Sequence, residues 1–197
     1  MAGLTVGQTA PGFRLHSAQG PEVALADFRG RKHVVVWFTK GMGCVFCRQH
    51  MSQLARVYPE LQKRNTEVLE IVPGTLERAQ QYAAKYRLPF PYLCDTDDSV
   101  RRAWHVDVRR HGPGWYVKAL RSALTAEKPQ NDFSQAPPAL GEMTTMLRDD
   151  DAGLYLVDRD GVIRYTHVIA YIDAGTKAIH PLPPPDDLVR ALDRLAA

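Results

Sequence analysis

Two cysteines of the chain, Cys44 and Cys47, have the C-x-x-C spacing that allows a dithiol to cycle with a disulfide. They follow an unbroken apolar run and precede a stretch in which apolar residues recur every three or four positions. A junction between a buried strand and a helix presents free backbone N–H groups and the positive end of the helix dipole, which favour an anion. A thiolate is such an anion, so the pKa of a cysteine here is expected to fall below its usual value of about 8.5.

Metal binding is the main alternative for this pair. Two cysteines supply only half of a zinc site, and a second pair of ligands at metal spacing is missing from the sequence. We therefore expect a redox pair, with no metal and no cofactor. The third cysteine, Cys94, ends another apolar run and is interpreted as a small buried hydrophobe.

The elements that must position the pair can be predicted from the pattern around it. Residues 34–38 are β-branched or aromatic on both alternating faces, which is typical of a strand in the middle of a covered sheet. After Cys47, an apolar stripe predicts a helix to about Arg64; it consists of Met51, Leu54, Tyr58 and Leu61.

The rest of the chain alternates strand and helix patterns. Short strands are predicted near 13–15, 68–72 and 90–93, and helices at 75–86, 100–104 and 186–195. Two β-rich runs, 153–157 and 162–168, flank an Asp-Gly turn and predict a late β-hairpin. This order favours one α/β domain over 1–197 with a central mixed sheet and helices on both faces. We interpret residues 107–150 as an insertion or lid.

The composition of the chain argues against two classes of function, nucleic-acid binding and membrane association. The net charge is +3 over 197 residues with no basic block, which argues against nucleic acid as the main partner. The N-terminus carries no charged-then-apolar leader, and the longest apolar run is too short to span a bilayer, so no membrane association is expected. One close cysteine pair plus a single cysteine suits a reducing compartment, and a cytoplasmic location is predicted.

Three further segments resemble peroxiredoxin-like proteins of the alkyl hydroperoxide reductase and thiol-specific antioxidant superfamily. Residues 6–15 are similar to the opening segment of that family, 25–30 to its next turn, and 153–164 to its late hairpin. Together with a C-x-x-C at the corresponding place, they cover most of the chain. The resemblance implies a thioredoxin-like fold and a thiol-dependent peroxidase acting on hydrogen peroxide or organic hydroperoxides.

The family's P-x-x-x-[ST]-x-x-C frame, laid on this chain, puts Lys40 at the Pro, Cys44 at the hydroxyl residue and Cys47 at the peroxidatic cysteine. Two of the three positions are changed, and the chain resembles the branch in which a cysteine replaces the hydroxyl. In this register Cys47 attacks the peroxide, becomes a sulfenic acid and condenses with Cys44 to a disulfide. The resemblance also implies a thiolate-stabilising arginine; Arg148 is the nearest candidate, and Arg48 is a second source of positive charge.

Two other functions stay open. A thioredoxin-like register makes Cys44 the exposed nucleophile of a thiol–disulfide oxidoreductase, although Ala152 and Gly153 hold the place of that family's cis-proline. The other hypothesis is a redox sensor that has this fold but does not turn over a substrate. For the peroxidase, the expected partners are a peroxide and a thioredoxin- or glutaredoxin-like reductant. Many proteins of this fold are dimers, so a homodimer is an expectation by analogy.

Overall fold

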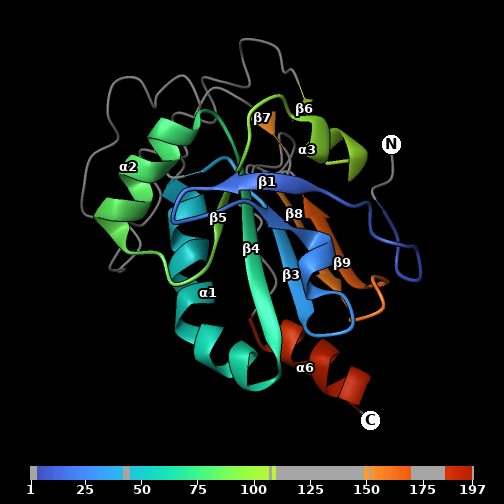
Figure 1. Ribbon diagram of the computed structural model, residues 1–197. Helices are drawn as coiled ribbons and strands as arrows, with labels where there is room; N and C mark the ends of the chain where they lie inside the picture. The colour runs from blue at the N-terminus through green and yellow to red at the C-terminus, as the bar shows by residue number, and fades with distance from the viewer. Residues whose placement is uncertain are drawn as a thin grey trace, which may run out of the picture.

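A computed structural model of the protein describes residues 4–41, 45–106, 108–109, 149–150, 152–169 and 185–196. Their helical elements are η1 (Leu25–Phe28), α1 (Val45–Lys63), α2 (Leu76–Tyr86), α3 (Ser99–Ala103) and α6 (Pro185–Ala196). The strands are β1 (Arg14–Ser17), β2 (Val23–Ala24), β3 (His33–Phe38), β4 (Thr66–Pro73), β5 (Tyr92–Asp95), β6 (Val108–Arg109), β7 (Asp149–Asp150), β8 (Ala152–Val157) and β9 (Ile163–Ile169) (Figure 1).

Seven of the described strands form one mixed sheet, in the order β2-β1-β5-β4-β3-β8-β9. Strands β3, β4 and β5 run parallel to one another, whereas β8 and β9 form an antiparallel hairpin beside β3. The α/β architecture, the mixed sheet and the late hairpin are therefore confirmed.

Helices cover both faces of the sheet, as predicted. On one face, Val35 and Trp37 of β3 pack in a core that includes Met51 of α1, Ala79 of α2 and Leu188 of α6. On the other face, the alternate residues of β3 join a second core; it contains Leu25 of η1 and Val100 and Trp104 of the α3 region. Because all six residues of β3 are buried, the strand lies between two apolar layers, which explains its unbroken apolar run.

Most predicted elements shift by one or two residues at their ends, and the shifts of α1 and β5 matter most for the site. Helix α1 begins at Val45, so Cys47 lies within its first turn instead of before it. Strand β5 begins at Tyr92, after Pro91, which cannot donate a ladder hydrogen bond. Phe90, predicted as strand, is buried in the core and accepts a 2.9 Å hydrogen bond from the Gln19 side chain through its carbonyl.

Aspartates cap the start of α3, as the sequence predicts. Asp95 accepts hydrogen bonds from the backbone N–H groups of Val100 and Arg101, at 3.2 and 2.8 Å, and Asp97 accepts one from Ser99 at 2.9 Å. The carboxylates thus satisfy donors that a helix start leaves open.

The hairpin turn is organised by Asp158. Its Oδ1 accepts hydrogen bonds from the N–H groups of Asp160 and Val162, both at 2.9 Å, and its Oδ2 accepts one from Arg164 at 2.5 Å. Burial alone raises the pKa of this carboxyl, but the hydrogen bonds and the Arg164 charge outweigh burial and lower it.

The segment predicted as an insertion or lid is described only at its ends. Val108 pairs with Asp150, and Arg109 with Asp149, in an antiparallel two-stranded ladder. The remainder of 107–150 lies outside the described residues, so its role stays a prediction.

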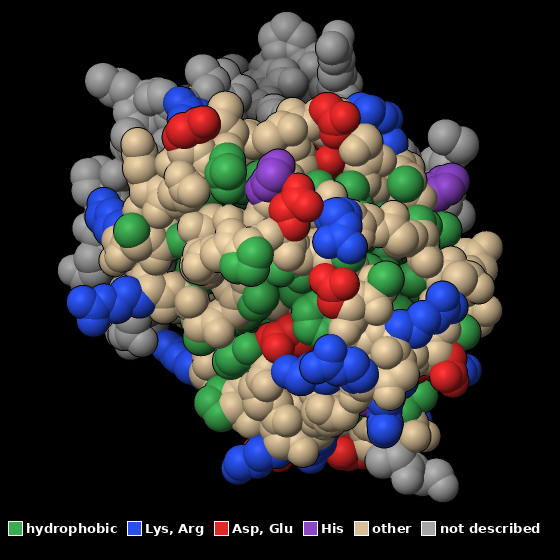
Figure 2. All heavy atoms as spheres, viewed as in Figure 1, with side chains coloured by type: hydrophobic (Ala, Val, Ile, Leu, Met, Phe, Trp, Pro, Cys, Tyr) green, Lys and Arg blue, Asp and Glu red, His purple; other side chains and the backbone are tan. Residues whose placement is uncertain are grey.

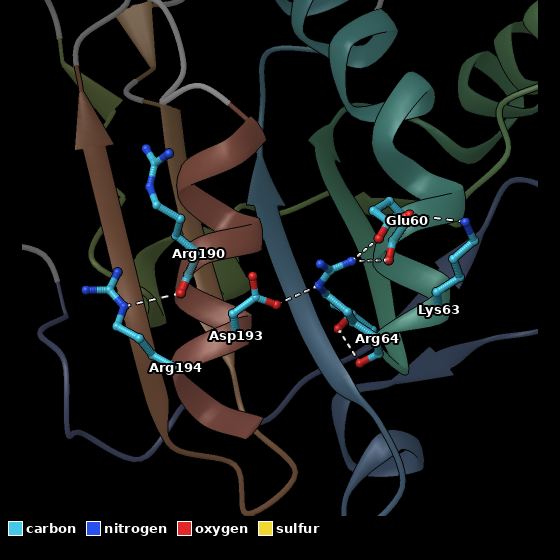
Figure 3. A network of polar contacts seen from close by, with 7 residues as sticks. Glu60, Lys63, Arg64, Arg190, Asp193 and Arg194 are labelled. Atoms are coloured by element: carbon cyan, nitrogen blue, oxygen red, sulfur yellow. Dashed lines mark hydrogen bonds and ion pairs between the residues drawn. The ribbon is translucent and has the colours of Figure 1, made fainter. Parts of the chain in front are cut away.

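Charged side chains on the surface are mixed in sign. Figure 2 shows Lys and Arg interspersed with Asp and Glu on the face drawn. Between α1 and α6, Arg64 donates to Asp193 at 2.9 Å and also pairs with Glu60 of its own helix (Figure 3). Such exposed pairs are screened by solvent and contribute little to stability. Across the described part of the chain, no helix has the length and apolar character needed to cross a membrane.

Candidate active site

The segment that leaves β3 is buried and held by backbone geometry. Thr39 has no exposed surface, and Lys40 is 8% exposed, so Lys40 is not a solvated turn residue. Gly41 has a positive φ of +79°, and a Cβ at this position would lie 3.0 Å from the hydroxyl oxygen of Tyr92. Glycine is therefore required here, both by the backbone conformation and by the space against β5.

Cys47 lies in the first turn of α1, beneath the surface. Its side chain has no exposed area and packs in the core shared by β3 and α1, together with Trp37, Met51 and Tyr92. Its position at the start of a 19-residue helix places the sulfur where the helix dipole favours a negative charge.

The other two predicted site residues, Cys44 and Arg148, lie outside the described residues. Arg48, the second predicted source of charge, directly follows Cys47 and is only 3% exposed. A buried cation held close to a thiol would favour the thiolate.

Arg101 is a cation at the end of β3 that the sequence analysis did not single out. It comes from α3, is 1% exposed, and lies over the ring of Phe38 with 5.7 Å between its Cζ atom and the ring centroid. Its Nη2 donates a 2.7 Å hydrogen bond to the carbonyl oxygen of Thr39. The residue thus joins α3 to the point where the chain leaves the central strand.

Glu70 is the second residue that the sequence analysis missed. It is fully buried in β4, next to Trp37 of β3 and Tyr92 of β5 in the register of the sheet. Thr39 Oγ1 donates a 2.9 Å hydrogen bond to its Oε1, while its Oε2 has no partner among the described residues. Burial raises the pKa of this carboxyl well above its usual value, and the Thr39 hydrogen bond only partly opposes the shift. Burial therefore favours the uncharged form of Glu70.

A sequence signal for Glu70 does exist. It is the one charged residue in the run VLEIV, where alternation places it on the same side as Val68 and Val72. A carboxyl between two core positions is a buried polar group, and buried polar groups mark candidate sites. Arg101 carries no such signal, because it stands beside the exposed Arg102 in a short charged helix.

Two histidines lie near the same end of the sheet. His50, one turn after Cys47, is buried, with 2% of its surface exposed. Burial, and secondarily the charge of His167, lower the pKa of His50 to about 4. His50 is therefore neutral at neutral pH.

Cys94 is a buried hydrophobe, as predicted. It is 4% exposed and packs in the core beneath α1 and α2. Burial, followed by the charge of Glu77, raises the pKa of its thiol to about 11. Such a thiol is a poor nucleophile at neutral pH, so Cys94 is a weak candidate for a third redox partner.

The described residues form one notable cavity but no cluster of metal ligands. Among the described residues, no three His, Cys, Asp or Glu side chains group so as to hold a metal ion. A mostly apolar cavity of about 140 Å³ lies at the opposite end of β3, lined by residues that include Leu25, Lys32, Val34 and Asp158. Cys47 is not among the residues that line it, and Val34 lies near the start of β3, whereas the segment toward Cys47 leaves the other end of that strand.

Comparisons with known proteins agree on one family. A family model described as "AhpC/TSA family" matches residues 6–166. A chloroplastic peroxiredoxin Q of Sedum lineare is 34% identical over 105 residues, which are 53% of this chain and 56% of that protein. A thiol-disulfide oxidoreductase ResA of Geobacillus thermodenitrificans is 35% identical over 104 residues, 52% of this chain and 59% of that protein. The chain thus spans less than two thirds of the length of either relative.

Solved structures support the fold. The crystal structure of peroxidoxin BcpB from Mycobacterium tuberculosis superposes with a TM-score of 0.65 at 14% identity, covering 98% of both chains. At this identity the likeness concerns the fold alone. It confirms the thioredoxin-like architecture that the sequence resemblance implied.

Proposed function

Because the chain belongs to the AhpC/TSA family, we propose that it is a thiol-dependent peroxidase with Cys47 as its nucleophile. The observation that carries the proposal is the position of Cys47: a buried thiol in the first turn of α1, directly followed by the buried Arg48. The helix dipole and the neighbouring cation both favour the thiolate over the thiol. A thiolate is the species that attacks a peroxide.

The proposed cycle needs three steps. The Cys47 thiolate attacks one oxygen of the peroxide, the O–O bond breaks, and the departing oxygen takes up a proton to leave as water or an alcohol. The resulting Cys47 sulfenic acid is attacked by the Cys44 thiol, which forms the disulfide and releases water. An external dithiol of the thioredoxin or glutaredoxin type then reduces the disulfide by exchange through a mixed disulfide.

The burial of Cys47 bears on the choice of substrate. Its sulfur has no exposed area in this conformation, and in-line attack on a protein disulfide requires an accessible sulfur. Hydrogen peroxide and small hydroperoxides need much less room. We therefore place a small peroxide first among the substrates. A reducing, cytoplasmic location stays part of the proposal, because the cycle depends on a reduced dithiol pool.

A second candidate is a thiol–disulfide oxidoreductase that acts on protein disulfides through Cys44. The similarity to the ResA protein favours it. It predicts disulfide reduction that Cys44→Ser abolishes, with little peroxide consumption.

One experiment separates the two. The rate of hydrogen peroxide consumption by the reduced protein is measured beside Cys47→Ser and Cys44→Ser, with Cys94→Ser as the matched control. The proposal expects fast consumption of peroxide by the wild type and by Cys94→Ser, and none by Cys47→Ser. In Cys44→Ser a sulfenic acid should be trapped on Cys47, where mass spectrometry detects it. Full peroxide turnover by Cys47→Ser would refute the assignment.

A further inference from the structure

Thr39, at the end of β3, is held by two buried ionisable side chains that reach it from opposite faces of the sheet. Glu70 shares its face of β4 with Val68 and Val72, which pack in the core beneath α1. Arg101 lies on the other face, over Phe38, whose ring belongs to the second core. We refer to Thr39, Glu70 and Arg101 as the Thr39 clamp.

The clamp fixes both polar groups of Thr39. The Thr39 hydroxyl donates to Glu70 at 2.9 Å and accepts a 2.9 Å hydrogen bond from the backbone N–H of Gly41. The Thr39 carbonyl accepts the 2.7 Å hydrogen bond from Arg101. All these atoms are buried, where a hydrogen bond from a charged donor is stronger than one between neutral groups. The direction in which the chain leaves β3 toward Cys47 is therefore set by the clamp.

The two ionisable members of the clamp differ in charge. Arginine stays protonated at any pH at which a protein is folded. Burial favours the acid form of Glu70, which carries no charge to neutralise the guanidinium. Asp95, on the strand next to β4, lies near Arg101, and burial raises its pKa as well, although hydrogen bonds from α3 and the Arg101 charge oppose that shift.

Other titratable groups surround the same end of the sheet and must be considered together with the clamp. Among the described residues they are Lys40, Arg48, His50, Tyr92, Cys94 and His167. His50, with a pKa of about 4, and Cys94, with a pKa of about 11, are both neutral at neutral pH. Lys40 and Arg48 add positive charge, so the effect of Arg101 must be measured as a difference between variants.

We propose that Arg101 is a positioning residue for Cys47: through the Thr39 carbonyl it sets the start of the turn that leads to the thiol, and its buried charge favours the thiolate. The inference rests on the proposed function only in treating Cys47 as the reactive thiol. It assigns the role to a residue of α3, which approaches the end of β3 from the face opposite to α1.

The test compares R101M with R102M in the full-length reduced protein. Methionine keeps the volume of the side chain but removes the charge and the donor to Thr39. Arg102 lies on the same helix with its side chain exposed, which makes R102M the matched control. The rate of alkylation of Cys47 by iodoacetamide is measured from about pH 5 to about pH 9 by peptide mass spectrometry, because alkylation reports the thiolate fraction. Cys94 in the same digest serves as the internal reference.

The proposal expects R101M to alkylate Cys47 about three- to tenfold more slowly near neutral pH, with the midpoint of the profile moved to higher pH. This range corresponds to the loss of one buried charge at medium range in a protein interior. R102M should stay within about twofold of the wild type. R101M and R102M profiles that coincide would overturn the proposal.

E70Q tests the assumed charge state of the clamp. Glutamine keeps an acceptor for the Thr39 hydroxyl but cannot ionise. If Glu70 is uncharged, the alkylation profile keeps its midpoint near neutral pH. Faster alkylation in E70Q by threefold or more would mean that a carboxylate cancels the Arg101 charge, and that result contradicts the proposal.

R101K keeps the test decisive if R101M does not fold. Lysine retains the charge but lacks the forked guanidinium that reaches the Thr39 carbonyl. The expected result is an alkylation midpoint close to the wild type together with a lower kcat for peroxide at similar KM. Wild-type values of both quantities would refute the positioning role. Since alkylation needs no peroxide, a wild-type protein without peroxide turnover would refute the peroxidase and leave this measurement interpretable.

Discussion

Replacing Glu70 by glutamine should make the protein progressively more stable than the wild type as the pH rises. Burial favours the protonated form of this carboxyl in the folded state and raises its pKa well above the usual 4.5. In the unfolded chain the same group ionises above about pH 4.5. Folding therefore takes up a proton at neutral pH, and that uptake becomes more costly with each pH unit.

The magnitude follows from linkage. Between the unfolded and the folded pKa, the native state binds one proton more than the unfolded state, so the free energy of unfolding falls by about 1.4 kcal/mol per pH unit. The stabilising contribution of the protonated group is complete below the unfolded pKa and is lost as the pH rises toward the folded pKa. In E70Q this slope is absent. The difference in stability between E70Q and the wild type should therefore grow by up to about 1.4 kcal/mol per pH unit above about pH 4.5, until the pH reaches the folded pKa.

Urea denaturation of both proteins at several pH values, under reducing conditions, measures this difference. His50 and all other titrating groups are present in both proteins, so their contributions cancel in the difference between the two free energies of unfolding. D186N, which changes an exposed aspartate, is the control and should show a constant difference from the wild type. A difference between E70Q and the wild type that does not change with pH would show that folded Glu70 is ionised, and the reasoning about the Thr39 clamp would fail with it.

Three further predictions concern other buried groups. G153A should lower the free energy of unfolding by about 1–3 kcal/mol, because its Cβ would lie 2.7 Å from a methyl carbon of Val106; a G153A/V106A double variant should lose less than the sum of the single changes in urea titrations. H50N should lose less stability than the wild type when the pH falls. Burial, and secondarily the charge of His167, lower the pKa of folded His50 to about 4. Below about pH 6.5 the histidine therefore takes up a proton in the unfolded chain but not in the folded protein. This proton costs the wild type about 2 kcal/mol between pH 6.5 and pH 5, and equal acid sensitivity of both proteins would contradict it. Cys94, whose thiol pKa burial raises to about 11, should react with iodoacetamide at pH 8 far more slowly in the native protein than in urea; equal rates by mass spectrometry would contradict its burial.

Local patterns were sufficient to predict most elements. The apolar run before Cys44 became β3, and the stripe that starts at Met51 became the inner face of α1. The Asp-Gly turn after β8 gave the hairpin, since turn chemistry acts over a few residues. The start of β5 was predicted two residues too early, because the apolar pattern continues through Pro91 while the hydrogen-bonded ladder does not.

The candidate site was only partly predictable. Cys47 could be identified from the C-x-x-C spacing and its place after a strand. Thr39, Glu70 and Arg101 could not be grouped, because the sequence separations between them are long and no local pattern connects them.

The sequence by itself determined the family, the order of strands and helices, and the cysteine at the start of α1, since each depends on motifs or on periodicity within one element. The tertiary structure alone decided what surrounds that cysteine. Parallel pairing of β3 with β4 brings Glu70 next to Trp37, and the packing of α3 on the opposite face brings Arg101 to the Thr39 carbonyl. Alternation along a strand fixes which face a side chain occupies, but only long-range packing decides which helix covers that face and which charges meet there.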